Sequence, residues 1–147
     1  MDYIEEFDKL KTKVLKYILF KKRTEQEVRL KFKIDESELL NEVIDELKEL
    51  NYINDKNYIE KAVNEYINLK NLSIREIRYK LASKGIKFNL IEEYINVNED
   101  RLLEYEKQSA INIINKKQNT MEKTQIFEYL IKKGYKEETV KKGVHDE

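Results

Sequence analysis

The sequence repeats itself at a spacing of 49 residues, and this repeat restricts the possible folds more than any other feature. At this offset Lys13–Ile18 aligns with Ala62–Ile67, and 84–86 (Lys-Gly-Ile) aligns with 133–135 (Lys-Gly-Tyr). Self-similarity at a period of roughly 20–50 residues is typical of arrays of small structural units. We therefore predict three tandem units, at residues 7–55, 56–102 and 103–147.

Each unit is expected to be helical. The 147 residues include no proline and only three glycines, whereas sheets and tight hairpins need more turn residues. Lysine, glutamate, leucine and isoleucine, which dominate the chain, suit helices. We predict an all-α fold in which three three-helix units form an elongated, curved array.

The ends of the helices can be predicted from capping residues. The second helix of each unit should begin at a capping box: Thr24 with Glu27, Ser73 with Glu76 and, in a degenerate form, Glu122 with Gln125. It should end at Gly85 and Gly134, placed for the left-handed conformation. Between units one and two, Asn51 is expected to be left-handed and Asn54 or Asp55 to cap the next helix. Tyr52 and Ile53 should pack between the units.

Composition excludes several classes of site. Cysteine is absent, which rules out disulfides and thiolate metal sites and fits a reducing cytoplasm. No apolar run approaches the ~20 residues of a membrane span, and the acidic N-terminus lacks the layout of a signal peptide. We therefore expect a cytoplasmic protein with no membrane segment.

No arrangement of catalytic residues is present. The single histidine, His145, lies two residues from the end, where chains usually fray. The three glycines are too far apart for a phosphate-binding loop, and the carboxylates alternate with lysines as helix-surface pairs do. We expect a binding protein without enzymatic activity, metal or cofactor.

Charge is balanced overall but unevenly distributed. The 29 basic and 29 acidic residues cancel, yet residues 35–49 hold seven acids against one lysine. Residues 70–87 hold six bases against one glutamate. Two readings stay open: separate acidic and basic binding surfaces, or solvated helix faces that differ in sign.

Four segments together extend over about residues 13–142: Lys21-Lys22-Arg23-Thr24-x-x-Glu27-Val28, Leu47-x-Glu49-x-Asn51-Tyr52-Ile53-Asn54-Asp55-x-x-Tyr58, Ile77-x-x-x-Leu81-x-x-Lys84-Gly85-Ile86 and Leu130-x-Lys132-Lys133-Gly134-Tyr135. In this order they resemble motifs of the RecX family of regulators of the RecA recombinase. Asn51 replaces a usual glycine, Ile59 replaces a usual alanine, and an N-terminal extension common in the family is missing. We therefore expect either a short member or a fragment.

The resemblance implies a modulator that lies in the groove of RecA filaments on single-stranded DNA and inhibits ATP hydrolysis, strand exchange and co-protease activity. We expect a monomer that can also bind DNA directly but weakly. Basic residues near equivalent repeat positions are the candidate contacts, with Arg75 and Arg78 first because they share one face of a helix. Two alternatives remain: a helix-turn-helix-like DNA-binding regulator, and a helical scaffold for another protein. The other candidates are Lys84, Lys87, Lys21, Lys22, Arg23, Lys132, Lys133 and Lys136.

Overall fold

The computed structural model describes residues 2–33 and 37–146, with the side chains of 37 and 144–146 excepted. Every regular element in these ranges is an α-helix, so the predicted all-α fold class is confirmed. The helices are α1 (Tyr3–Phe20), α2 (Glu25–Lys31), α3 (Ser37–Glu49), α4 (Asp55–Leu69), α5 (Ile74–Ser83), α6 (Phe88–Val97), α7 (Glu99–Lys117), α8 (Lys123–Lys133) and α9 (Glu137–Asp146).

The capping boxes are formed as predicted. The Thr24 hydroxyl accepts the N–H of Glu27, and the Glu27 carboxylate accepts the N–H of Thr24, which starts α2. Ser73 and Glu76 exchange the same two bonds at the start of α5. At α8 the side chain of Gln125 accepts the N–H of Glu122. These bonds satisfy amides that the first turn of a helix leaves without partners.

The helix ends also follow the prediction. Gly85 and Gly134 have φ of +81° and +100°, and Asn51 has φ of +67°, so all three occupy the left-handed region. Asn54 caps α4 by accepting the N–H of Asn57. Lys70 ends α4 with φ of +50°, a left-handed residue that the sequence did not reveal. A non-glycine side chain costs about 1–2 kcal/mol in this conformation.

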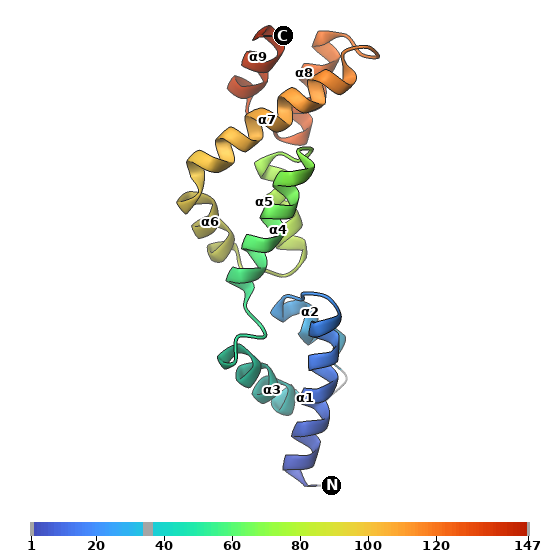
Figure 1. Cartoon of the computed structure of the whole chain (residues 1–147), viewed down its shortest axis with the longest axis vertical. Coiled ribbons are helices and arrows are strands. Elements are labelled where there is room, and N and C mark those ends of the chain that lie inside the picture. Colours follow the sequence, from blue (N-terminus) through green and yellow to red (C-terminus); the bar gives the residue numbers. More distant parts are fainter. Residues whose placement is uncertain (1, 34–36, 147) are drawn as a thin grey trace.

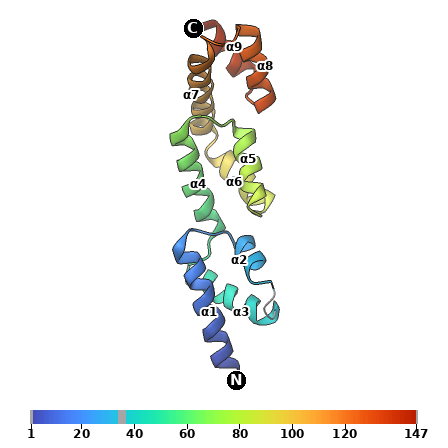
Figure 2. The same ribbon diagram turned by 90° about the vertical axis from the view of Figure 1, so that its right-hand side faces the viewer.

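Three hydrophobic clusters follow one another along the chain. The first joins α1, α2 and α3, the second joins α4, α5 and α6, and the third joins α7, α8 and α9. Leu102 and Tyr105, at the start of α7, belong to the second cluster, so α7 links the second cluster to the third. The molecule is elongated, with the chain termini at opposite ends (Figures 1 and 2).

The segment between α3 and α4 differs in part from expectation. Ile53 is buried in the first cluster, but Tyr52 is 47% exposed, so its predicted packing between units is wrong. Asp55 does not cap α4. Its carboxylate instead accepts the N–H of Glu25, at the start of α2, at 3.0 Å. Burial raises the pKa of Asp55, because the charged carboxylate loses water between two helices.

Gly134→Ala should destabilise the protein by at least about 1–2 kcal/mol, measured by urea unfolding, because alanine at this φ is strained. A Cβ atom at Gly134 would also lie 2.8 Å from Cβ of Arg75, a contact that forces one helix to shift. Lys70→Gly is the matched control, because it removes a side chain from an exposed left-handed residue. A loss of stability in the control as large as that of Gly134→Ala would contradict this explanation.

Candidate partner-binding surface at the helix junctions

Two buried hydroxyl groups join the three clusters. The Thr24 hydroxyl donates to the main-chain carbonyl of Lys84 at 2.7 Å, and the Ser73 hydroxyl donates to that of Lys133 at 2.6 Å. Both hydroxyl residues are 0% exposed. Each hydroxyl therefore caps its own helix and also satisfies the end of a helix in the next cluster.

An ion pair and a glycine accompany each of these bonds. Lys84 Nζ lies 3.8 Å from the Glu27 carboxylate, and Lys133 Nζ lies 3.3 Å from the Glu76 carboxylate. Both glutamates are the capping-box residues described above. Gly85 packs against Gln26 and Gly134 against Arg75, so each glycine lets two helices approach closely.

The two arginines that ranked first as contact candidates both have intramolecular partners. Arg75 Nη2 donates to the carbonyl of Lys132 at 2.7 Å, and its aliphatic stem covers Gly134. Arg78 Nε donates to the Glu92 carboxylate at 2.8 Å. Their shared helix face is therefore partly used inside the molecule, by α8 of the third cluster for Arg75 and by α6 of the second cluster for Arg78.

Other candidate cations are also engaged. The Arg23 guanidinium stacks 4.0 Å above the ring centre of Tyr17, a cation–π arrangement. Lys22 donates to the side chain of Asn57, and burial, with Lys61 nearby, lowers its pKa. Four candidates are exposed and make no ion pair with the described residues: Lys21, Lys87, Lys132 and Lys136.

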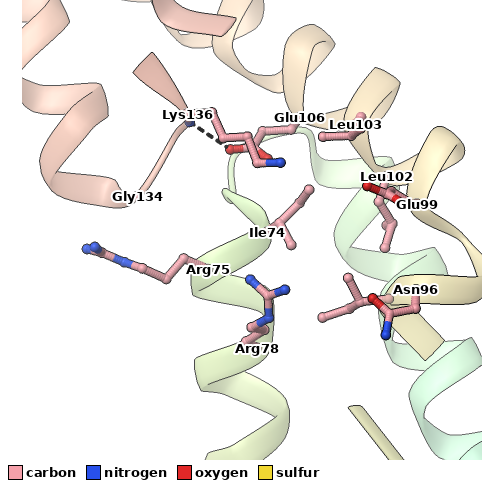
Figure 3. Close-up of a pocket in the computed structure, with 11 residues that line it drawn as sticks. Ile74, Arg75, Arg78, Asn96, Glu99, Leu102, Leu103, Glu106, Gly134 and Lys136 are labelled. Atoms are coloured by element: carbon pink, nitrogen blue, oxygen red, sulfur yellow. Dashed lines mark hydrogen bonds between the residues drawn. The ribbon is translucent and has the colours of Figure 1, made fainter. Parts of the chain in front are cut away.

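A cleft of about 250 Å³ lies at the junction of the second and third clusters, between α5 and α7 (Figure 3). Arg78 and Lys136 line it, together with the apolar side chains of Ile74 and Leu102. Glu106 of α7 also lines it and is only 1% exposed. Glu106 Oε1 accepts the N–H of Lys136 at 3.2 Å, while Oε2 has no hydrogen-bond partner among the described residues.

Glu106 was not among the predicted site residues, although its place on the apolar face of a helix can be read from the sequence. Leu102, Ser109 and Ile113 are buried at the helical spacing i−4, i+3 and i+7 from Glu106. An acid in the middle of a buried stripe is unusual unless it is paired. Burial raises the pKa of Glu106, while the N–H of Lys136 and the charges of Lys136 and Arg78 oppose that shift.

Other polar groups of α7 next to the cleft form hydrogen bonds within the protein. The Tyr105 hydroxyl donates to the carbonyl of Leu72 at 2.7 Å, and the hydroxyls of Ser109 and Tyr135 lie 2.6 Å apart. Burial raises the pKa of Tyr105 and that of Tyr135, so both phenols stay protonated at neutral pH. These bonds fix α7 against α5 and α8 and leave Glu106 Oε2 as the unsatisfied group.

The described part of the chain contains no cluster of three or more histidine, cysteine, aspartate or glutamate residues that could hold a metal ion. Within those same residues, no helix is both long and apolar enough to cross a membrane. The side chain of His145, the single histidine, lies outside the described residues.

Several known proteins are similar to this chain. The regulatory protein RecX of Finegoldia magna is 34% identical over 135 residues, covering 86% of this chain and 66% of that protein. That of Clostridium botulinum is 32% identical over 135 residues, covering 84% of this chain and 61% of its own length. The chain thus spans somewhat less than two thirds of the length of these relatives. No protein-family model matches the sequence.

The fold is also shared with solved structures. The crystal structure of RecX from Lactobacillus salivarius superposes with a TM-score of 0.80 and 26% identity, covering 97% of each chain. A second crystal structure of a regulatory protein RecX superposes with a TM-score of 0.77, covering 96% of this chain and 73% of that one. At 24% identity, the second likeness concerns the fold alone.

Replacing Glu106 with glutamine should change how stability depends on pH. Because the pKa of Glu106 is raised in the folded state, wild type gains stability from its protonation at low pH and loses it as pH rises through that pKa. Glutamine does not titrate. The free energy of unfolding of Glu106→Gln, minus that of wild type, should therefore increase as the pH rises from about 4 toward neutrality.

Chemical denaturation of both proteins across this pH range measures the difference. Asp55 lies at the first junction, away from Glu106, and titrates in both proteins, so its contribution to the stability difference cancels. A difference that stays constant with pH would show that burial does not disfavour the charged form of Glu106.

Proposed function

The chain belongs to the RecX family of regulatory proteins, and from this we propose that it modulates the RecA recombinase by binding along RecA filaments on single-stranded DNA. The proposed effect is inhibition of ATP hydrolysis, strand exchange and co-protease activity. The observation that supports this proposal best is an elongated molecule with unpaired lysines beside two successive junctions, Lys87 at the first and Lys136 at the second.

We further propose that the molecule is three copies of one unit, at residues 7–55, 56–102 and 103–147. Contacts that recur 49 residues apart support this. The bond from Thr24 to Lys84 and the bond from Ser73 to Lys133 are related by this offset, as are the two Lys–Glu pairs. Because α7 begins at Glu99, a third unit defined by its helices would begin there, four residues before the boundary at 103.

A protein built from repeated units suits a partner that presents the same surface repeatedly. A RecA filament presents the same protein surface at each step and a phosphate backbone that runs alongside, so repeated contacts add along the array. Lys87 and Lys136 occupy equivalent positions 49 residues apart. Their exposed ammonium groups can pair with carboxylates or phosphates of such a partner without breaking an ion pair among the described residues.

The two alternatives place different demands on the structure. A helix-turn-helix reader needs a helix whose side chains reach base edges, yet both arginines of α5, the best-placed helix, bond within the molecule. A general helical scaffold would use the same exposed lysines but would be indifferent to RecA. Tight binding to duplex DNA without RecA would favour the first alternative, and failure to sediment with RecA filaments would favour the second.

Reversing two exposed lysines should weaken filament binding. Lys87→Glu with Lys132→Glu should raise the concentration needed to inhibit RecA ATPase on single-stranded DNA by roughly tenfold, because two attractive contacts become repulsive. The loss should shrink as salt is raised, since exposed charges are screened. The circular dichroism spectrum should not change, because neither side chain makes an ion pair with the described residues.

Lys9→Glu with Lys13→Glu is the matched control, with the same change in net charge on exposed positions of α1. The control should inhibit RecA nearly as well as wild type. Equal losses in both double variants would mean that net charge, rather than this surface, determines binding. Absence of any wild-type effect on RecA ATPase, together with failure to sediment with filaments, would contradict the proposed function.

A further inference from the structure

The cleft beside Glu106 contains a polar group that the fold does not use. Glu106 lines the cleft and is 1% exposed, and its buried Oε2 has no hydrogen-bond partner among the described residues. Leaving a buried polar atom unsatisfied costs about 1–3 kcal/mol, and more when it is charged. A leucine at this position would avoid that cost, so a role in binding a ligand explains the carboxylate better than a role in packing.

The cleft is lined by hydrogen-bond donors as well as an acceptor. Glu106 supplies a hydrogen-bond acceptor, while Arg78 and Lys136 supply donors, and all three side chains are directed to the same space (Figure 3). Arg78 uses Nε to bind Glu92, which leaves its two terminal nitrogens for a further acceptor. Arg75 points away from this space, toward the end of α8 (Figure 3), where it binds the carbonyl of Lys132.

Much of the rest of the cleft is apolar. Ile74, Ile95, Leu102 and Leu103 line it, Asn96 and Glu99 add two polar side chains, and the described lining residues include no aromatic side chain. A nucleobase that binds in a pocket usually stacks on an aromatic ring or a free guanidinium plane. The walls therefore fit a small aliphatic group that carries its own donor and acceptor better than they fit a base.

We propose that this cleft binds an amide group of a protein partner, either a main-chain peptide or the side chain of asparagine or glutamine. The amide N–H donates to Glu106 Oε2, and the amide C=O accepts from Arg78 or Lys136. A cation alone would face Arg78 and Lys136, and an anion alone would face Glu106, whereas an amide is neutral and satisfies both sides. The identity of the partner as a RecA filament rests on the proposed function.

The cleft is particular to the second junction. At the offset of 48 residues that aligns the first helices of units two and three, Glu106 corresponds to Tyr58, which has no carboxylate. Near the first junction the acid is Asp55, and its carboxylate already accepts the N–H of Glu25. The chain therefore offers one amide site of this kind among its described residues.

Glu106→Gln tests the site with little change in shape. The glutamine oxygen can still accept the N–H of Lys136, but an NH₂ group then replaces Oε2 and opposes the donor of the ligand. Affinity for RecA filaments on single-stranded DNA, measured by co-sedimentation at pH 7.5, should fall roughly tenfold. Melting temperature should be equal to or higher than that of wild type, which a purely structural role of Glu106 would not give.

Two further variants complete the design. Glu104→Gln removes a charge from an exposed position of the same helix and should leave filament affinity unchanged. Lys136→Met removes the side-chain donor at an exposed position while keeping the main-chain N–H that binds Glu106, and it should weaken binding severalfold. The second variant tests the cleft if Glu106→Gln does not fold.

A titration without RecA tests the amide site independently of the proposed function. N-methylacetamide, added to the full chain at up to molar concentration, should shift the backbone amide resonances of Lys136 and its neighbours in wild type but not in Glu106→Gln. An unchanged filament affinity in folded Glu106→Gln, the absence of this localised shift, or a saturable response to nucleosides instead would overturn the amide site. Failure of wild type to bind filaments, with the localised shift present, would overturn the proposed function alone.

Discussion

The connection between the three helical clusters depends on a hydroxyl group that makes two bonds at once. Thr24 and Ser73 each accept the third amide of their own helix and donate to a carbonyl sixty residues further along the chain. A helix start and a helix end are both deficient in hydrogen bonds, one in acceptors and the other in donors. One buried hydroxyl satisfies both, so the same residue that starts a helix also sets where the next cluster lies.

The charge distribution of the surface follows from this arrangement. Lys84 and Lys133 lie beside the capping glutamates, and Arg75 covers Gly134, so part of the basic character of residues 70–87 is used inside the molecule. Lys87 and Lys136, beside the junctions, stay exposed. The same packing encloses Glu106, whose unsatisfied oxygen lowers stability. Stability and the capacity to bind a partner are therefore opposed at the second junction.

Much of the fold could be predicted because it depends on local rules. Capping boxes and left-handed glycines act within about five residues, so Thr24, Ser73, Gly85 and Gly134 were readable without any tertiary information. What could not be predicted depends on contacts between residues far apart in the chain. Tyr52 and Ile53 both carry large side chains that can pack in a core, and nothing local tells which of the two faces it. Arg75 and Arg78 share a helix face as predicted, but their partners come from α8 and α6.

The sequence by itself determined the helical class, the places where helices start and stop, and the resemblance to RecX proteins. Each of these depends on residue types at fixed short spacings, or on their recurrence at 49 residues. Only the tertiary structure decided which cations are exposed and that Glu106 lies in a cleft with one oxygen unpaired. Burial and pairing arise from helices far apart in the chain, and the free energy of a charge depends on what those helices place around it.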